Sequence, residues 1–219
     1  MKTIVDNYSS ELIERRWLSD RSFEITLEKP TTFEYLAGQW IRLTSDAVER
    51  DYTLVTAPTD PNLALCIRYI EGGSLVPTLS HVPIGTRFDF KGPQGYFTFK
   101  PSHRPAVFVA TGTGVAPFVS MARSGVSGFT LLHGVRTAAD LYYASVLKST
   151  AKHYIPCLSE NHASSEDVFH GRVTDFLFKH LAPGPYDFYL CGRREMIRDV
   201  TICVDEKFPE SLIFTEIFY

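Results

Sequence analysis

The sequence predicts two domains of different fold class, an antiparallel β domain followed by an α/β domain with a parallel sheet. In residues 8–99 apolar residues alternate with polar ones or form short runs, and Gly, Pro and Asp interrupt them repeatedly. This pattern is typical of a small barrel or sandwich of antiparallel strands. After residue 105, short apolar runs alternate with segments of helical periodicity. That alternation is typical of a parallel sheet with helices on both faces.

Composition limits the classes of function. The chain has 219 residues, of which 44% are hydrophobic and 21% charged, and its net charge is -3. A slightly acidic chain without a lysine- or arginine-rich run is a poor match for nucleic acid as the main partner. No stretch has the apolar length of a membrane span, and Asp6 precedes any signal-peptide core. We therefore expect a cytoplasmic monomer with no nucleic-acid partner and no membrane span.

The cysteines and histidines indicate no metal site. The four cysteines form no C-x-x-C pair, and the seven histidines show no ligand spacing. Zinc sites and iron–sulfur clusters need such closely spaced ligands. We expect no bound metal.

In the β domain, residues 50–56 are the first with recognisable chemistry. On a strand, Arg50 and Tyr52 share one face, whereas Thr53 lies on the other. A guanidinium suits a phosphate, an aromatic ring can lie against a flat cofactor, and a hydroxyl can reach the edge of that cofactor. The alternative interpretation is an exposed arginine and a core tyrosine on an ordinary strand.

A second candidate is the glycine pair Gly72-Gly73, which is followed by Ser74 and Thr78. Glycines that lead into a short helix offer backbone N–H groups to a phosphate. The alternative interpretation is a turn followed by a short amphipathic helix that closes the barrel.

The polar, proline-bracketed residues 100–105 predict a linker, with domains over 1–101 and 102–219. In the second domain we expect strands over 106–110, 129–133, 154–158, 188–190 and 212–215, and helices over 118–122, 140–148, 173–179 and 195–204. Ligands of such sheets bind beyond the carboxyl ends of the strands, where residues 111–114, 134–137 and 191–194 fall.

Residues 104–118 contain the motif around which the second domain is organised. An apolar run ends at Thr111, and Gly112 and Gly114 form a turn before Pro117. The spacing is G-x-G-x-x-P, with Pro117 in the place of the third glycine of a dinucleotide-binding fold. Glycines here allow a phosphate or a ring to approach the backbone. A buried strand with a glycine turn is the alternative.

Together these motifs resemble the ferredoxin–NADP(+) reductase superfamily, especially compact bacterial reductases and reductase components of oxygenases. The resemblance extends from about residue 8 to the C-terminus and rests on Gly38-Gln39, Arg50-x-Tyr52-Thr53, Gly72-Gly73 with Leu79, Gly92-Pro93-x-Gly95, Gly112-Thr113-Gly114-x-x-Pro117 and Cys191-Gly192. It implies a six-stranded antiparallel β-barrel that binds FAD and an α/β domain that binds the nicotinamide nucleotide.

The resemblance also implies roles in the barrel. Arg50 would bind the flavin phosphate, Tyr52 would pack on the isoalloxazine, and Thr53 would hydrogen-bond near the flavin N5. Further FAD contacts are expected from Arg68, Tyr69, Gly73, Ser74 and Thr78. Val76 stands where the family usually has a serine or threonine, so Ser74 or Thr78 supplies the hydroxyl. FAD is favoured over FMN.

In the second domain the resemblance places Thr111, Gly112, Thr113 and Gly114 under the nicotinamide. Cys191 and Gly192 would lie beside that ring, with the thiol holding it and not acting as a nucleophile. The alternative for Cys191 is a buried, chemically silent residue.

The adenosine end of the nicotinamide nucleotide is expected near Arg136 and Arg172. NADPH-dependent relatives usually have an arginine after a serine at the next strand end, where this chain has Ser159-Glu160. A carboxylate repels a 2′-phosphate and accepts hydrogen bonds from a free 2′-hydroxyl. We therefore favour NADH over NADPH. Arg136 and Glu160 as solvated surface charges are the alternative.

The C-terminal residues include Glu216, which resembles a family glutamate near the flavin. Phe218 or Tyr219 would be the family's aromatic over the flavin or adenine. A closing run of aromatics is unusual for a terminus, since termini tend to fray. A core strand is the competing account.

The resemblance implies a flavin-dependent NAD(P)H reductase, with Thr53, Cys191 and Glu216 at the reacting rings. Hydride would pass from NADH or NADPH to FAD, and single electrons would pass to a ferredoxin, a flavodoxin, a cytochrome or an oxygenase component. The acceptor would be a separate polypeptide, because the chain has no cysteine cluster. Alternatives are a reductase of free flavin and a flavin-binding electron-transfer subunit without turnover of its own.

Overall fold

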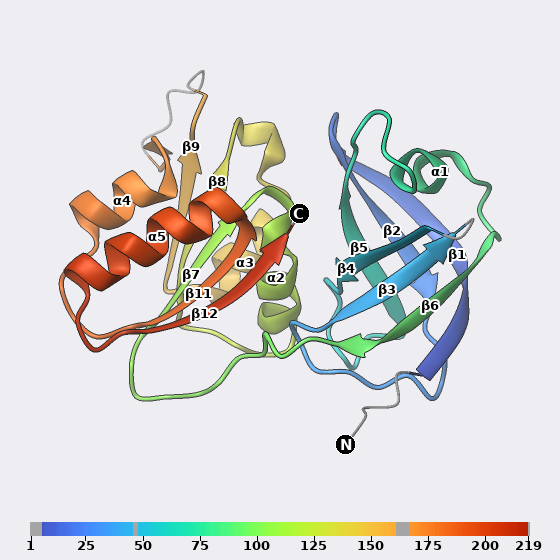
Figure 1. Ribbon diagram of the computed structural model, residues 1–219, viewed down its shortest axis with the longest axis horizontal. Coiled ribbons are helices and arrows are strands. Elements are labelled where there is room, and N and C mark those ends of the chain that lie inside the picture. Colours follow the sequence, from blue (N-terminus) through green and yellow to red (C-terminus); the bar gives the residue numbers. More distant parts are fainter. Residues whose placement is uncertain (1–5, 46–47, 161–166, 219) are drawn as a thin grey trace. The chain divides into compact units, whose positions relative to one another are not determined.

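The computed structural model describes residues 6–45, 48–160 and 167–218. Contacts divide the chain into two units. The first contains Met1–Phe99 and Ala116–Ser124, and the second contains Lys100–Val115 and Gly125–Tyr219. Figure 1 shows the elements of both. The expected boundary between residues 101 and 102 stays a prediction.

The first unit is built on a six-stranded antiparallel sheet. Its strands are β1 (Asp6–Ser19), β2 (Ser22–Glu28), β3 (Trp40–Ser45), β4 (Val48–Thr53), β5 (Asn62–Arg68) and β6 (Arg87–Gln94), in the order β4-β3-β6-β1-β2-β5. Leu54, just after β4, also forms an antiparallel bridge with Leu65 of β5. The two outer strands of the order therefore approach each other, and the predicted antiparallel fold is confirmed.

Apolar side chains from these strands fill one core. Phe23, Ile25 and Leu27 alternate along β2 and are fully buried, as expected of a strand with one face on the interior. Tyr8 stacks on Phe90 at a ring-centroid distance of 5.2 Å.

Helix α2 (Ala116–Arg123) belongs to the first unit by its contacts, although the sequence predicts it as part of the second domain. Ser120 Oγ donates a hydrogen bond to the Thr56 carbonyl oxygen over 2.6 Å. Arg123 Nη1 donates to the Val55 carbonyl oxygen over 2.9 Å. The chain therefore returns to the first unit directly after the glycine turn.

The second unit contains a parallel sheet, as predicted, but with six strands in place of the five that were expected. Its strands are β7 (Ala106–Thr111), β8 (Thr130–Val135), β9 (His153–Leu158), β10 (Phe169–His170), β11 (Asp187–Arg193) and β12 (Leu212–Phe218), in the order β10-β9-β8-β7-β11-β12. The short strand β10 was not expected, because two residues are too few to produce a periodic pattern.

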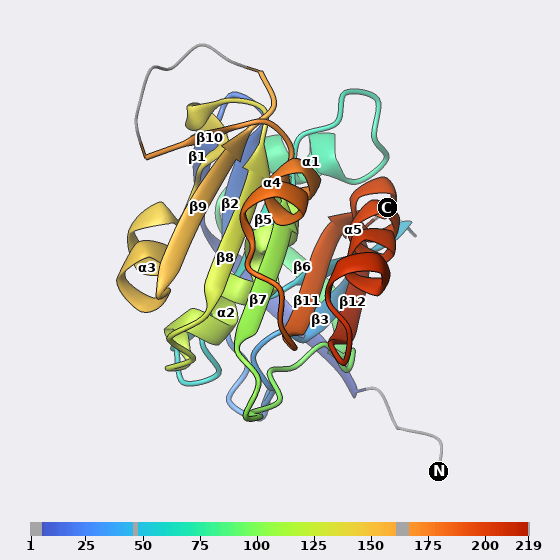
Figure 2. The same ribbon diagram turned by 90° about the vertical axis from the view of Figure 1, so that its left-hand side faces the viewer.

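Helices lie on both faces of this sheet. Helices α4 (Val173–His180) and α5 (Arg194–Lys207) lie side by side (Figures 1 and 2) and pack on the face that carries Val107, Val109 and Leu132. Helix α3 (Ala144–Thr150) is on the other face, where Lys148 lies over the Tyr154 ring.

The helix predicted over residues 140–148 is two elements. A 3₁₀ turn, η2, covers Ala138–Asp140, and α3 begins only at Ala144. Tyr143 adopts a left-handed conformation with φ +62°, which interrupts the helix. Apolar periodicity does not reveal such a reversal.

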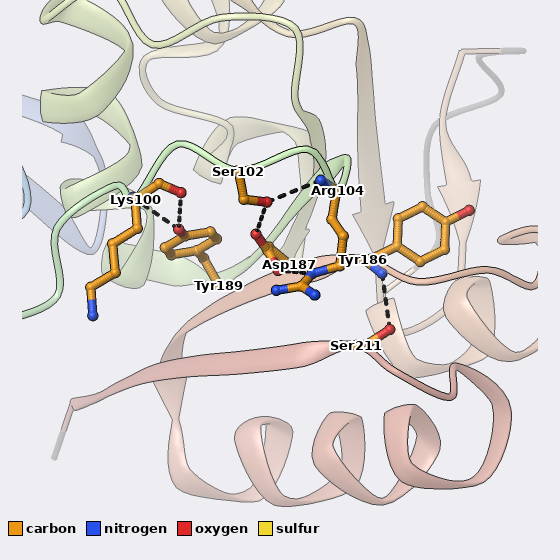
Figure 3. A network of polar contacts seen from close by, with 7 residues as sticks. All are labelled: Lys100, Ser102, Arg104, Tyr186, Asp187, Tyr189 and Ser211. Atoms are coloured by element: carbon orange, nitrogen blue, oxygen red, sulfur yellow. Dashed lines mark hydrogen bonds and ion pairs between the residues drawn. The ribbon is translucent and has the colours of Figure 1, made fainter.

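The segment predicted as a linker is attached to β11 of its own unit (Figure 3). The Ser102 hydroxyl and the Arg104 Nε donate to the two carboxylate oxygens of buried Asp187, over 2.5 and 2.6 Å. The backbone N–H of Lys100 donates to the Tyr189 hydroxyl over 3.0 Å. Residues 100–104 are therefore fixed by side chains that are distant in sequence. Within the described ranges, no helix has the length and apolar character to cross a membrane.

Candidate functional site

Arg50 and Ser74, both predicted to contact a cofactor, lie next to each other in the first unit. Arg50 is exposed on β4, and its Nη2 donates a hydrogen bond to Ser74 Oγ over 3.1 Å. Its Nη1 donates to the Glu49 carbonyl oxygen over 2.7 Å. The remaining N–H groups of a guanidinium in this position can bind a phosphate. The pair is a candidate phosphate site.

Tyr52 and Thr53 follow Arg50 on β4 and point to opposite faces because strand side chains alternate. Tyr52 packs against the core of the first unit. Burial raises the pKa of its phenol to about 12, although the charge of Arg50 opposes this shift. Thr53 is buried opposite Trp40 of β3. A neutral aromatic ring thus lies beside an exposed cation.

The chain that follows β5 returns to Arg50 through Ser74. Arg68 ends β5 and is exposed, and Tyr69 follows it. The Gly73 N–H donates to the Ile70 carbonyl oxygen over 3.1 Å, which closes a turn immediately before Ser74. This turn is the local reason that Ser74 reaches Arg50.

Thr78 lies in helix α1 (Val76–His81), and its carbonyl oxygen accepts the Val82 N–H. Arg15 of β1 holds the end of this helix. Its Nη1 donates to the Leu79 and Val82 carbonyl oxygens over 3.2 and 2.7 Å. These carbonyls are otherwise short of partners at a helix end.

In the second unit, the glycine turn packs directly on the end of β11. A 3₁₀ turn, η1 (Gly112–Val115), follows β7. A Cβ on Gly114 would lie 2.4 Å from the Cys191 carbonyl oxygen, and a Cβ on Gly192 would lie 2.2 Å from Thr111 Oγ1. The Thr111 hydroxyl also accepts the Arg193 N–H over 3.1 Å. The two glycines are needed because the two backbones touch.

This contact brings together predicted residues that are far apart in sequence. Thr111 and Gly114 meet Cys191 and Gly192 at the carboxyl ends of neighbouring strands, and Gly112 and Thr113 lie between them in the chain. Pro117 lies within α2 and groups with the first unit. For Gly114 the structure supplies a packing reason in addition to the expected approach of a ligand.

Cys191 and Glu216 are paired across β11 and β12. Cys191 Sγ lies 4.0 Å from Glu216 Oε2. Burial, reinforced by the Glu216 charge, raises the pKa of the thiol well above its ordinary value. Cys191 is therefore a neutral thiol at physiological pH, whereas a nucleophilic cysteine needs the thiolate.

Arg136 and Glu160 form an ion pair. They follow β8 and β9, and Arg136 Nε lies 3.6 Å from Glu160 Oε1. The Glu160 N–H donates to the Arg136 carbonyl oxygen over 3.0 Å. Arg172 stands elsewhere, at the start of α4, where its N–H donates to Asp175 Oδ2 over 3.1 Å. The sequence predicts separate roles for Arg136 and Glu160 at the adenosine end of the nucleotide, whereas in the structure their side chains form an ion pair with each other.

His133 is a buried polar residue that sequence reasoning missed. It lies on β8 beside Ala110, and its Nδ1 is 3.0 Å from the Tyr154 hydroxyl. Within the part of the chain that is described, His133 Nε2 has no hydrogen-bond partner. Burial lowers the pKa of the imidazole to about 4. An isolated histidine in an apolar strand gives no sequence signal for these contacts.

Of the two C-terminal aromatic residues predicted to cover the flavin or adenine, the structure describes only one. Phe218 is the last residue of β12, and Tyr219 lies outside the described residues. Within those residues, no three His, Cys, Asp or Glu side chains gather as a metal site would require.

Comparisons with known families match both units. Residues 11–99 match the family model of the oxidoreductase FAD-binding domain. Residues 108–201 match that of the oxidoreductase NAD-binding domain.

Characterised relatives are reductases. The chain is 28% identical to the reductase component of propane 2-monooxygenase from Mycolicibacterium goodii, over 87% of this chain and 61% of the relative. It is 32% identical to ferredoxin–NADP reductase B of Sorangium cellulosum, over 66% of this chain and 65% of the relative. It is 31% identical to the ferredoxin–NAD(P)(+) reductase component of the naphthalene 1,2-dioxygenase system of Pseudomonas putida, over 91% and 64%. The chain thus spans less than two thirds of the length of these relatives.

Solved structures share the fold. A cytochrome P450 reductase from Amycolatopsis matches with a TM-score of 0.86 and 24% identity, over 98% of this chain and 70% of that one. A ferredoxin NADP+ reductase from Neisseria gonorrhoeae with bound FAD and NADP matches with a TM-score of 0.82 and 18% identity, over 95% and 98%.

Proposed function

Because the chain belongs to the ferredoxin–NADP reductase superfamily, we propose that it is an NAD(P)H reductase that passes electrons through FAD to a separate protein. The observation that supports this most is the presence of two distinct clusters. One has an exposed arginine beside a serine and a neutral tyrosine, and the other has a glycine turn against a buried cysteine.

The first cluster fits a flavin. Arg50 and Ser74 offer donors to a phosphate, and Tyr52 offers an apolar ring that stays uncharged. Thr53 would hydrogen-bond at the edge of the ring system. Arg68, Tyr69, Gly73 and Thr78 are the further contacts that we propose. Bound FAD supplies the conversion between a two-electron hydride and single electrons.

The second cluster fits the nicotinamide end of the nucleotide. Thr111 is fixed by its bond with the Arg193 N–H, and Gly112 and Thr113 present backbone next to it. Cys191, neutral and buried, would contact the ring by packing and not by covalent chemistry. Glu216 beside the thiol would orient it. These residues exclude water and align the reactive carbon, which is the main contribution a protein makes to hydride transfer.

NADH is the nucleotide that we favour. The Arg136 guanidinium is engaged by the Glu160 carboxylate, so a 2′-phosphate would have to displace an anion. A free 2′-hydroxyl would meet an acceptor instead. Arg172 would lie at the adenosine end as a further cation.

The acceptor that we propose is a ferredoxin or an oxygenase component. Curated relatives include reductase components of propane 2-monooxygenase and naphthalene 1,2-dioxygenase systems. Flavodoxin is a further candidate, and we propose a cytoplasmic monomer. Cytochrome c reduction can serve as a general assay of single-electron delivery.

Absorbance spectroscopy tests the proposal. Purified protein should show flavin bands between about 370 and 460 nm that bleach anaerobically with NADH. The flavin should remain bound through gel filtration, which a reductase of free flavin would not show. A protein that binds no flavin, or whose flavin is not reduced by either nicotinamide nucleotide, would contradict the proposal.

A further inference from the structure

His133 is a buried polar residue that the proposed reaction does not use. Its imidazole packs against two tyrosine rings of the second unit. The ring centroid is 6.3 Å from that of Tyr142 and 6.1 Å from that of Tyr154, at interplanar angles of 68° and 72°. The Tyr154 hydroxyl lies 3.0 Å from Nδ1, whereas Nε2 has no hydrogen-bond partner in the described ranges. A buried group with an unpaired atom calls for an explanation, and its contact with Tyr142 points to one.

Strand register places His133 directly before the glycine turn. Ala110 of β7 is paired with His133 of β8. The next pair, Thr111 with Gly134, is at the end of β7, where the glycine turn begins. Paired residues of parallel strands have their side chains on the same face of the sheet. The imidazole and the ring packed on it therefore lie next to this turn.

Tyr142 is held in place by the backbone on both sides of it. The Leu141 N–H donates to the Ala138 carbonyl oxygen over 3.2 Å, which closes the 3₁₀ turn η2 before it. After it, Tyr143 adopts a left-handed conformation with φ +62°, and its carbonyl oxygen accepts the Leu147 N–H over 3.2 Å. Left-handed residues other than glycine are uncommon and occur preferentially at functional sites. With only 8% of its surface exposed, the Tyr142 ring has a defined position.

The hydroxyl end of Tyr142 reaches the glycine turn. A Cβ on Gly112 would lie 4.0 Å from the Tyr142 hydroxyl oxygen, which is ordinary van der Waals contact. Gly112 itself has φ +54°, so its backbone conformation depends on what surrounds it. Protein interiors are close-packed and transmit displacements from one group to the next. A continuous series of contacts thus leads from His133 through Tyr142 to Gly112.

We propose that Tyr142 is a positioning residue for hydride transfer: packed on His133, it holds the Gly112 backbone where the nicotinamide ring is aligned. The inference rests on the proposed reductase function and extends it to a residue that acts through the glycine turn and not on the nucleotide itself. Alignment of the reacting atoms determines the rate of hydride transfer. Loss of this support should therefore lower the limiting rate more than the affinity for NADH. A tyrosine that only fills the interior is the competing outcome.

Anaerobic stopped-flow reduction of the FAD-loaded protein separates rate from affinity. Tyr142→Leu keeps an apolar side chain that no longer reaches Gly112. It should lower the limiting rate of flavin reduction about tenfold, while the half-saturating NADH concentration stays within about twofold of wild type. Tyr142→Phe keeps the ring and loses only the oxygen beside Gly112, so it should lower the rate about threefold.

Tyr186→Leu is the matched control. Tyr186 precedes β11 at the amino end of the same sheet, where its ring centroid is 5.7 Å from that of Phe188 and 5.8 Å from that of Phe208. The substitution removes the same kind of ring from the same unit. It should lower stability in urea unfolding and leave both kinetic parameters unchanged.

A double-mutant cycle tests whether Tyr142 acts through Gly112. Gly112→Ala adds a methyl group beside the Tyr142 hydroxyl and strains a residue in the left-handed region, so it should itself slow reduction. If the two residues are coupled, Tyr142→Leu should lower the rate of the Gly112→Ala protein by less than about threefold. Tyr142→Phe serves for the cycle if Tyr142→Leu does not fold.

Several results would overturn the inference. These are an unchanged limiting rate in either Tyr142 variant, a loss of rate matched by an equal rise in half-saturating NADH, and multiplicative effects of the Tyr142 and Gly112 substitutions. An equal loss of rate in Tyr186→Leu would also overturn it. A wild-type protein whose bound flavin is not reduced by NADH would instead contradict the proposed function.

Discussion

Arg136 and Glu160, which follow neighbouring parallel strands, form an ion pair at 3.6 Å. Each side chain is about half exposed, at 46% and 54%. Exposed pairs contribute little to stability, so the pair is better placed to affect which nucleotide binds than whether the protein folds.

Glu160→Gln should improve the use of NADPH. Removing the carboxylate frees the Arg136 guanidinium for a 2′-phosphate, and KM for NADPH should fall by about three- to tenfold while that for NADH rises slightly. Steady-state kinetics with both nucleotides measure the ratio of KM for NADPH to KM for NADH. Asp205→Asn, an exposed acid on α5, is the control for net charge. An unchanged ratio would make the pair a solvated surface contact.

Arg50→Ala should release the flavin. Loss of a charge-assisted contact with phosphate is expected to weaken FAD binding by about ten- to a hundredfold. Flavin content after gel filtration and titration of the apoprotein report the loss, and Ser74→Ala should have a smaller effect. Arg87→Ala removes an exposed arginine of β6 and should keep the flavin. Full flavin retention in Arg50→Ala would remove this residue from the site.

Cys191→Ser should slow hydride transfer and leave the flavin bound. The serine hydroxyl needs hydrogen bonds that a buried thiol does not, so packing against the nicotinamide should change. Anaerobic stopped-flow reduction by NADH measures the rate, with Cys203→Ser, which changes a buried cysteine of helix α5, as a control. A normal rate would support a purely structural cysteine.

The same thiol predicts a pH dependence of stability. Its pKa in the folded protein is raised by burial, so the folded state keeps the neutral thiol while the unfolded chain ionises near pH 8.5. The contribution of this thiol to the free energy of unfolding is therefore complete below that pH and is lost as pH rises further. Cys191→Ala should flatten this alkaline decline in urea unfolding; an identical decline in both proteins would contradict the assignment.

His133 predicts the opposite pH dependence, a loss of stability in acid. Its pKa is lowered to about 4 by burial, so unfolded chains bind a proton as pH falls below about 6.5 while the folded state stays neutral. Stability from this residue is complete above pH 6.5 and declines as pH falls to 4, by about 2 kcal/mol at pH 5.

His133→Leu is the variant that checks this. At pH 7 it should cost only the 3.0 Å contact between His133 Nδ1 and the Tyr154 hydroxyl, because Nε2 has no partner to lose in the described residues. Urea unfolding at pH 7 and pH 5 should show a smaller difference than in the wild type. An equal difference would place the acid sensitivity in other groups.

Asp187 tests the attachment of residues 100–104. Its carboxylate is buried and accepts from Ser102 and Arg104. Asp187→Asn keeps the volume but removes the charge, and because Arg104 is then left without its counter-ion, unfolding should become easier by about 3 kcal/mol. Flavin content should be unaffected. Equal stability of the variant would show that this network contributes little.

Local patterns were sufficient for much of the fold. Strand alternation around Phe23 and Ile25 predicted the antiparallel sheet, and the apolar run that ends at Thr111 predicted both a strand and the turn after it. These signals lie within a few residues, and the physical preference of a segment for strand or helix is largely local.

The two fold classes, the order of the glycine motifs and the types of residue at the strand ends can all be read from the amino-acid sequence. The contact partners of the side chains are known only from the folded chain: Ser74 for Arg50, Glu160 for Arg136, Asp187 for Arg104 and Tyr69 for Trp17. Partners depend on register, on turns and on which strands become neighbours, and periodicity contains none of this information. Gly114 shows the difference, because its position is visible in the motif, whereas the backbone of Cys191 that forbids a side chain there is visible only in the fold.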